Sequence, residues 1–292
     1  MDLRSFKDFR GLLIRKSPMD NPQIVTIFGR DHEAKNKIYF NALKDANIAF
    51  GTSVGATSKP NEDCIGVSVL GSETVLAIAD GHWGKDASEI AIAKAVDLLH
   101  LNFRPSKDSE TRARLFALFE QINVTLFDMA ISAPGLPCSE TSLVVCHIKE
   151  SVQSKYLYWS SFGDSYLFIL RGPNLKQLNT LNPFWLGMLS KLSENAKSKT
   201  ISIKFLSDEA GYVGVAGGLE SGIEKLEVGD ILFLCTDGLT GSDKEPDAAW
   251  LDVVIDILKS VLSLESKVER IIGSALARGE EDNISCVMAQ IT

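Results

Sequence analysis

The sequence predicts an α+β fold built in layers, because its apolar patterns form runs of strands and pairs of helices. Short apolar runs bounded by turn residues are typical of strands, and they fall within 65–79, 142–171 and 231–235. Apolar residues at helical spacing extend over 85–101, 111–129 and 247–277. The strands are therefore grouped, whereas a doubly wound sheet would alternate single strands with helices.

Composition narrows the class of protein. The chain has 292 residues, of which 45% are hydrophobic and 23% charged, which is typical of a globular protein with a full core. A net charge of -8 argues against nucleic-acid binding, which relies on clustered Lys and Arg. No run approaches the ~20 apolar residues that span a bilayer. Residues 1–16 lack the pattern of a secretory signal, so we expect a cytoplasmic protein with no membrane partner.

The length and patterns favour a single large domain. Residues 1–50 carry mixed charge and weak periodicity, and we expect them to be an amino-terminal extension packed on a core domain of residues 51–292. The five cysteines are odd in number and show no CxxC spacing, so we expect reduced, buried thiols.

The first strands of the core domain form a predicted hairpin. Residues 65–70 and 74–79 flank the turn residues Gly71-Ser72-Glu73, and the second strand ends at Asp80-Gly81. Further along, 142–148, 156–161 and 166–171 predict a β-meander with a tight turn at 163–165. Residues 284–291 predict a last strand, and the irregular stretch 173–210 predicts a surface flap.

Acidic residues recur where the predicted strands begin or end. Glu62-Asp63 precedes a strand, Asp80-Gly81 and Asp237-Gly238 each follow one, and Asp282-Asn283 precedes the last. A single Asp-Gly pair is first of all a turn signal. Several carboxylates at converging strand ends would instead repel one another unless cations neutralised them. Oxygen ligands with few Cys or His candidates nearby indicate Mg²⁺ or Mn²⁺ and not zinc.

These sites lie in motifs that resemble the protein phosphatase 2C family of metal-dependent serine/threonine phosphatases. The motifs follow the family's order over residues 55–292, and they are Asn61-Glu62-Asp63, Ala79-Asp80-Gly81-His82-Trp83-Gly84, Phe162-Gly163-Asp164-Ser165, Cys235-Thr236-Asp237-Gly238 and Glu281-Asp282-Asn283. The resemblance implies a central antiparallel β-sandwich flanked by helices on both faces. It also implies hydrolysis of phosphoserine and phosphothreonine by a water held between two metals at one edge of the sandwich.

The resemblance assigns the metal ligands by motif position. Asp80 would bridge two divalent cations, Mn²⁺ or Mg²⁺; Glu62 and the Gly81 carbonyl would hold one, and Asp237 and Asp282 the other. Asp164 would help a third, weaker metal to bind. Two such ions would activate water and neutralise charge on the phosphoryl oxygens.

We expect other residues of these motifs to have catalytic or supporting roles. A histidine at the position of His82 acts in the family as general acid toward the leaving oxygen. The alternative for this residue is a turn histidine satisfied by a nearby carboxylate. Asp63 and Asn283 are expected to support the site, with Asn283 bracing the Asp282 loop by hydrogen bonds.

Two departures from the family pattern affect the expected substrate site. The family places an arginine four residues before the metal-binding glutamate, where this chain has Ser58, with Lys59 beside it. Lys59 is the candidate for binding substrate phosphate, as a point charge without the bidentate geometry of arginine. The stretch 173–210 also lacks the family's usual flap signature and contains Asn182-Pro183-Phe184-Trp185, which we expect to pack the flap onto the body.

The sequence thus predicts a serine/threonine protein phosphatase. The alternative is a phosphatase-like binding or regulatory module without turnover, and small phosphomonoesters remain a second substrate class. The expected partner is a phosphorylated protein, with no nucleic acid, and the chain is expected to be a monomer.

Overall fold

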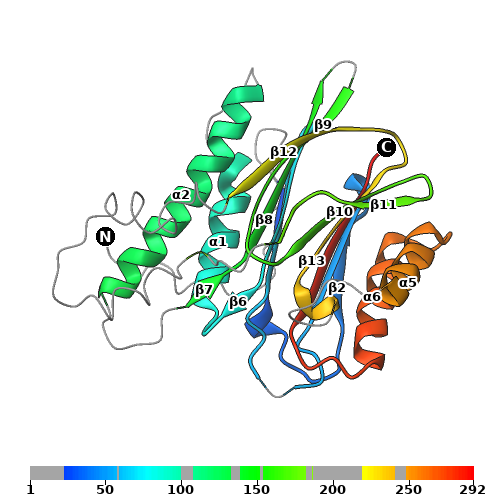
Figure 1. The fold of residues 1–292 in the computed structure, drawn as a ribbon, viewed down its shortest axis with the longest axis horizontal. Helices are drawn as coiled ribbons and strands as arrows, with labels where there is room; N and C mark the ends of the chain where they lie inside the picture. The colour runs from blue at the N-terminus through cyan, green and yellow to red at the C-terminus, as the bar shows by residue number, and fades with distance from the viewer. Residues whose placement is uncertain are drawn as a thin grey trace.

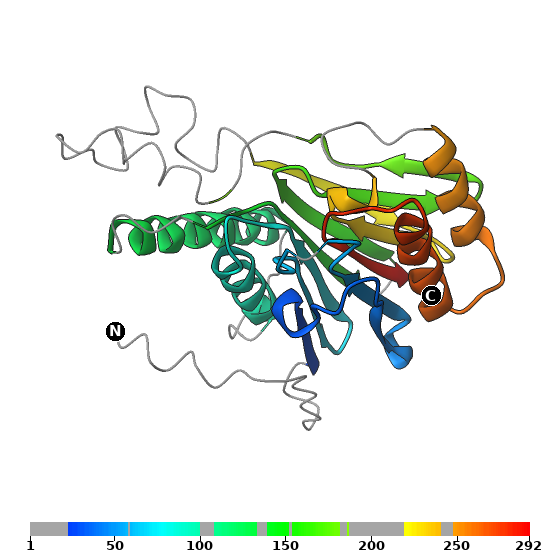
Figure 2. The same cartoon turned by 90° about the horizontal axis from the view of Figure 1, so that it is seen from below.

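Two antiparallel sheets face each other at the centre of the molecule, with helices on both outer faces (Figures 1 and 2). The computed structural model describes residues 23–57, 59–99, 108–132, 139–151, 154–181, 186, 219–240 and 248–292. The predicted α+β sandwich with flanking helices is therefore confirmed.

Within the part of the chain that the structure describes, the first sheet contains six strands, including both strands of the predicted hairpin. Its order is β1 (Gln23–Phe28), β4 (Cys64–Leu70), β5 (Glu73–Ala79), β8 (Leu143–Ser151), β9 (Ser154–Phe162) and β12 (Glu220–Leu226). The helices α1 (Asp86–Val96) and α2 (Asp108–Ser132) cover its outer face, where they share a buried apolar cluster with β5 and β8. A two-stranded ladder of β6 (Gly81–His82) and β7 (Glu140–Thr141) continues from β5.

The second sheet also contains six strands among the described residues. Its order is β11 (Asn174–Gln177), β10 (Tyr166–Arg171), β13 (Ile231–Cys235), β14 (Ile284–Gln290), β3 (Ile48–Ser53) and β2 (Tyr39–Leu43). The helices α5 (Ala248–Lys259) and α6 (Leu264–Ala277) pack on its outer face. Ser263 caps α6 by accepting a hydrogen bond from the backbone N–H of Ser266.

The pleat of the central strands explains the layers. In β13 every residue is buried: Leu232 and Leu234 pack between the two sheets, whereas Ile231, Phe233 and Cys235 pack under α5 and α6. Because successive side chains of a strand point to opposite faces, a strand covered on both sides must be apolar throughout. The continuous apolar run in the sequence is therefore the signature of a strand between two layers.

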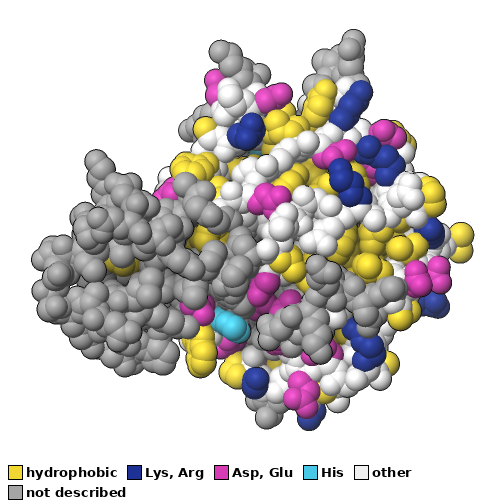
Figure 3. Space-filling model, in the orientation of Figure 1, with side chains coloured by type: hydrophobic (Ala, Val, Ile, Leu, Met, Phe, Trp, Pro, Cys, Tyr) yellow, Lys and Arg dark blue, Asp and Glu magenta, His cyan; other side chains and the backbone are white. Residues whose placement is uncertain are grey.

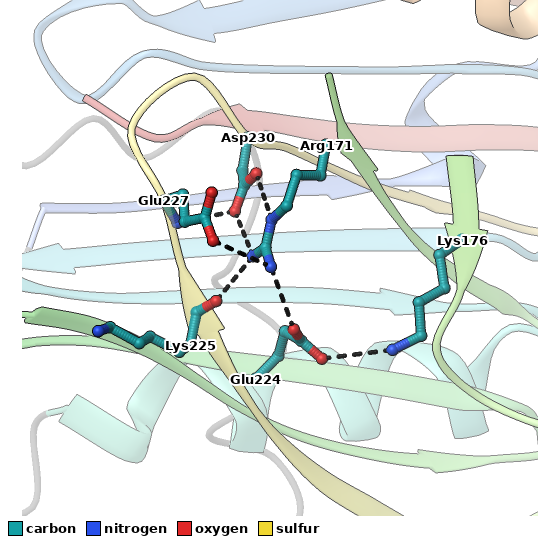
Figure 4. A network of polar contacts seen from close by, with 6 residues as sticks. All are labelled: Arg171, Lys176, Glu224, Lys225, Glu227 and Asp230. Atoms are coloured by element: carbon teal, nitrogen blue, oxygen red, sulfur yellow. Dashed lines mark hydrogen bonds and ion pairs between the residues drawn. The ribbon is translucent and has the colours of Figure 1, made fainter. Parts of the chain in front are cut away.

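A charged cluster fastens the two sheets at one end (Figure 4). The guanidinium of Arg171, at the end of β10, donates to both carboxylate oxygens of buried Asp230, at 3.0 and 2.8 Å, and to the carbonyl of Lys225 in β12. Glu224 and Glu227 lie 3.6 and 3.5 Å from the same guanidinium. The bidentate contact compensates the buried carboxylate of Asp230, and the hydrogen bond to the Lys225 carbonyl links β10 of one sheet to β12 of the other.

Two organisational predictions need correction. Residues 23–50 are not an extension, because they supply β1, β2 and the first half of β3, which pairs with β14. The predicted meander is also wrong: β8 and β9 pair in one sheet, but the turn at 163–165 carries the chain across to β10 in the other. The pairings of β1 with β4, of β3 with β14 and of β10 with β13 join segments far apart in the sequence, so strand patterns alone do not reveal them.

The remaining expectations concern cysteines, the flap and membranes. Cys64, Cys146, Cys235 and Cys286 are free and buried, as predicted, while Cys138 lies outside the described residues. Most of the predicted flap also lies outside them; the described part contains β11 and buried Leu186, whose backbone bridges to Thr141. None of the described helices is long and apolar enough to cross a membrane.

Candidate active site

The acidic motifs meet at one end of the sandwich because their strands are antiparallel neighbours. Cys64 pairs with Ala79, so β4 begins where β5 ends and Asp63 lies beside Asp80. Likewise Cys235 pairs with Cys286, so Asp237 and Asp282 flank the same strand ends in the second sheet. Several Asp and Glu side chains surround a histidine on the face shown in Figure 3, near the position of β6 and β7 in Figure 1.

Asp80 lies at the centre of this group. Burial raises its pKa well above the ordinary value, and the charges of Asp63, Asp237 and Asp164 raise it further. Its carboxyl group is also in hydrogen-bonding contact with that of Asp237. Such clustering of like charges is unfavourable without compensation, which is the electrostatic signature of a functional site.

Asp63 connects the Asp80 group to Asp282. Its side chain is fully buried, and burial together with the charges of Asp282 and Asp237 raises its pKa to about 8. One of its carboxylate oxygens, Oδ2, accepts a hydrogen bond of 3.0 Å from the hydroxyl of Thr236. The other, Oδ1, is buried with no hydrogen-bond partner among the described residues.

Glu62 interacts with the loop that carries Asp282. Burial raises the pKa of its carboxyl group, and the charge of Asp282 adds to this, whereas a hydrogen bond from the backbone N–H of Gly84 and the charge of His82 oppose it. The backbone N–H of Glu62 donates to the side-chain oxygen of Asn283 at 2.8 Å. The Asn283 amide donates in turn to the carbonyl of Val54, so this residue ties three loops together.

Hydroxyl groups hold the backbone of the acidic loops in place. The carbonyl of Asp80 accepts hydrogen bonds from the hydroxyl of Thr141, at 2.6 Å, and from the backbone N–H of Ser142, at 3.0 Å. The carbonyl of Glu62 accepts one from the hydroxyl of Ser88, at 2.5 Å. The backbone of the acidic loops is therefore held by hydrogen bonds from residues in and next to β7 and in α1, and these bonds do not involve the carboxylates.

Two glycines allow the backbones of these loops to approach one another. A Cβ at Gly81 would lie 2.5 Å from the carbonyl oxygen of Glu62. A Cβ at Gly238 would overlap the carbonyl oxygen of Asn283. Both Asp-Gly pairs therefore have a packing reason for glycine at this end of the sandwich, in addition to their role as turn signals.

His82 lies beside the acidic group and is half-exposed. Its ring nitrogen Nδ1 is 3.7 Å from Oε1 of Glu140, in the paired strand β7. Burial lowers the pKa of the imidazole, but the contact with Glu140 and the charges of Asp164 and Asp237 outweigh it, so the pKa is raised overall. Under the alternative of a turn histidine satisfied by a nearby carboxylate, Glu140 is the candidate carboxylate. Glu140 lies beside the acidic group as well.

The candidate phosphate-binding residue lies at the rim. Lys59 is exposed, and its charge acts on Glu62, where it lowers the pKa of the carboxyl group. Ser58, at the position of the family's arginine, lies outside the described residues.

The donor set can be tested against the divalent cations that the resemblance implies. The candidate ligands are carboxylates and one backbone carbonyl, which are the hard oxygen donors preferred by Mg²⁺ and Mn²⁺. The buried Oδ1 of Asp63, which accepts no hydrogen bond within the described ranges, also fits a cation site. In the described ranges, no three His, Cys, Asp or Glu side chains are already arranged to hold an ion. The chemistry of the site therefore fits the ions.

Some residues of this site were not singled out from the sequence. Glu140 has no local signal, because its proximity to His82 depends on the pairing of β6 with β7. Thr236 precedes Asp237 in the quoted motif, and a buried hydroxyl next to an acidic turn is the signal that could have indicated its contact with Asp63.

A two-sheet sandwich with helices on both faces and clustered carboxylates at one end is the class of fold and site that the resemblance to 2C-type phosphatases implied. The serine/threonine phosphatase Stp of Listeria welshimeri is 27% identical over 248 residues, which cover 82% of this chain and 94% of that protein. A putative 2C-type protein phosphatase of Streptococcus pyogenes is 25% identical, covering 82% and 96%.

A solved structure shares the fold. It is the catalytic domain of the serine/threonine protein phosphatase PstP in complex with two manganese ions, which is 23% identical, has a TM-score of 0.59, and covers 88% of this chain and all of that one. No protein-family model matches the chain. The resemblance to the protein phosphatase 2C family is confirmed by these relatives, and the fold by this neighbour.

Proposed function

We propose that this chain is a metal-dependent serine/threonine protein phosphatase that hydrolyses phosphoserine and phosphothreonine side chains of proteins. The observation that carries the proposal is the meeting of Glu62, Asp63, Asp80, Asp237 and Asp282 at one end of the sandwich. The relatives named as phosphatases support an enzyme over a module without turnover. Cytoplasmic residence, a monomeric state and the absence of nucleic-acid and membrane partners stay predictions.

Within this function the residues have distinct roles. Asp80, Glu62, Asp237 and Asp282, with the Gly81 carbonyl, would hold two divalent cations, and Asp164 would contribute to a third. Manganese is favoured by the two manganese ions of PstP, with magnesium as the other candidate. When bound, such ions lower the pKa of water and neutralise the phosphoryl oxygens. His82 would donate a proton to the departing serine or threonine oxygen.

Asp63 and Asn283 would act as supports. Asp63 is fully buried and is held by the Thr236 hydroxyl, and Asn283 joins the Glu62 loop to Val54. They would keep the ligand-bearing loops in register, as outer partners do around metal ligands in general.

The central test is release of phosphate from a phosphoserine peptide after chelator treatment, with and without added Mn²⁺. We expect turnover only with the cation, and a loss on the order of 10³-fold or more in Asp80→Asn or Asp237→Asn, because both remove a charge that would balance the ions. Asp252→Asn, on the exposed side of α5, is the matched control and should keep full activity. Metal-independent turnover, or full turnover in both site variants, would refute the proposal. A small phosphomonoester assayed in parallel separates the two substrate classes.

Lys59 is proposed as the residue that binds substrate phosphate. A lysine attracts phosphate as a point charge, so we expect Lys59→Ala to raise the KM for a phosphopeptide on the order of tenfold, with a smaller change in kcat. Lys259→Ala, at the end of α5, controls for loss of a surface charge. An unchanged KM in Lys59→Ala would exclude this role.

A further inference from the structure

Three consecutive residues, the two of the short strand β7 and the one before it, contact the loop that carries His82. The hydroxyl of Ser139, just before β7, donates to the carbonyl of Gly84 and accepts a hydrogen bond from the backbone N–H of Ala87 at 3.0 Å. The hydroxyl of Thr141 donates to the carbonyl of Asp80. Between these two anchors lies Glu140, which is directly paired with His82 in the β6–β7 ladder.

The two paired side chains differ in how much solvent reaches them. Glu140 is 5% exposed, whereas 51% of the His82 side chain is exposed. The carboxylate is therefore fixed inside the protein, while the imidazole extends to the surface and has several rotamers open to it. Nδ1 of His82 and Oε1 of Glu140 are 3.7 Å apart, within ion-pair range, and this contact favours one of those ring orientations.

Ring orientation matters for the role proposed for His82. A proton donor must direct one ring nitrogen at the leaving oxygen, and the contact made by the other nitrogen sets the direction of the ring. We infer that Glu140 is a positioning residue: it holds His82 through Nδ1 so that Nε2 is directed at the leaving oxygen. This inference rests on the proposed phosphatase function, and it deepens the description of the same site.

The test is a double-mutant cycle with Mn²⁺ present, on two substrates. The variants are Glu140→Ala, His82→Ala and the double variant, assayed with a phosphoserine peptide and with p-nitrophenyl phosphate. Because p-nitrophenolate leaves without a proton, we expect Glu140→Ala to lower kcat for the peptide by about 10- to 100-fold and for the aryl phosphate by much less, with KM for both little changed. In the His82→Ala background, removing Glu140 should cost nothing further, because it acts only through His82.

Two variants separate positioning from general damage. Glu140→Gln keeps an acceptor oxygen at the same place, so it should recover a large part of the peptide activity lost in Glu140→Ala. Glu73→Ala removes the other described Glu–His contact, between Glu73 and His147 at 2.8 Å, and should leave the ratio of the two substrates unchanged. Additive losses in the cycle, equal losses on both substrates, or no recovery in Glu140→Gln would overturn the inference.

A spectroscopic measurement keeps the inference testable apart from turnover. The chain has four histidines, so ¹⁵N-histidine labelling gives a simple spectrum. We expect the Nδ1 resonance of His82 to shift in Glu140→Ala and to stay in place in Glu73→Ala. An unshifted His82 resonance overturns the positioning role. A shifted resonance in a protein that releases no phosphate with Mn²⁺ would instead reject the phosphatase function while leaving the contact established.

Discussion

At the scale of single residues, the loop after Asp80 contains a costly conformation. Trp83 has a φ of 62°, in the left-handed region, and its side chain is 63% exposed. A residue with a Cβ pays roughly 1–2 kcal/mol there, a cost that glycine does not have. The loop is fixed on one side by the β6–β7 ladder and on the other by the start of α1, so the surrounding structure imposes this conformation.

The strain can be measured by comparing two substitutions at this residue. We expect Trp83→Gly to be more stable than Trp83→Ala by about 1 kcal/mol, because both lose the ring but only glycine relieves the left-handed strain. Urea unfolding of the two variants gives the difference. At an ordinary position alanine would be the more stable, so equal stability or an advantage for alanine would show that the loop is not strained.

At the scale of elements, cross-strand contacts fasten β5 to β8 at the end remote from the acidic site. Nε2 of His147 lies 2.8 Å from a carboxylate oxygen of Glu73, and His147 is almost fully buried. The hydrogen bond with His147 lowers the pKa of Glu73; burial opposes it, and the charges of Lys149 and Arg114 add to the lowering. The contact therefore stabilises the ionised form of Glu73.

This contact gives a stability that depends on pH. A carboxyl group with a pKa below its unfolded value of 4.5 contributes stability that is complete above that value and is lost as the pH falls through the folded pKa. We expect Glu73→Gln to lower the free energy of unfolding by roughly 1 kcal/mol at neutral pH, and the gap to close as the pH falls below 4.5 and through the folded pKa of Glu73. Urea unfolding of both proteins across this range is the measurement. A gap that widened in acid would contradict the assignment.

At the scale of the whole molecule, the chain has a net charge of -8, and part of that charge is concentrated at one end of the sandwich. Burying the carboxyl groups of Asp80, Asp63 and Glu62 close together costs free energy, and it raises their pKa values. A ligand that binds only the folded state raises the free energy of unfolding, and a cation bound among these carboxylates would offset their repulsion.

The matching prediction is that Mn²⁺ stabilises the folded protein. At a concentration of 100 times its Kd, a ligand adds about 2.7 kcal/mol to the free energy of unfolding, so thermal unfolding should shift upward by several degrees. Asp80→Asn should show a smaller shift, and Asp252→Asn should respond like the wild type. An unfolding temperature that did not respond to Mn²⁺ would exclude a cation site of this affinity, whatever the activity.

Much of the fold and the site could be predicted because their signals are local. The hairpin of β4 and β5, both pairs of helices and the strands β13 and β14 follow from periodicity and turn residues within short windows. Strands β1, β2 and β12 were not predicted. All three lie at sheet edges. β1 and β2 are short and stand in a stretch of weak periodicity, and β12 contains charged residues, so each resembles a loop when its partner is unknown.

The layered α+β class, the acidic motifs and the likeness to metal-dependent phosphatases can be read from the residues alone, because they depend on residue types at short spacing. The assignment of β9 and β10 to different sheets and the pairing of Glu140 with His82 appear only in the folded molecule. The physical reason is that strand partners are selected by ladder hydrogen bonds and burial between segments far apart in the chain, and no local pattern encodes that choice.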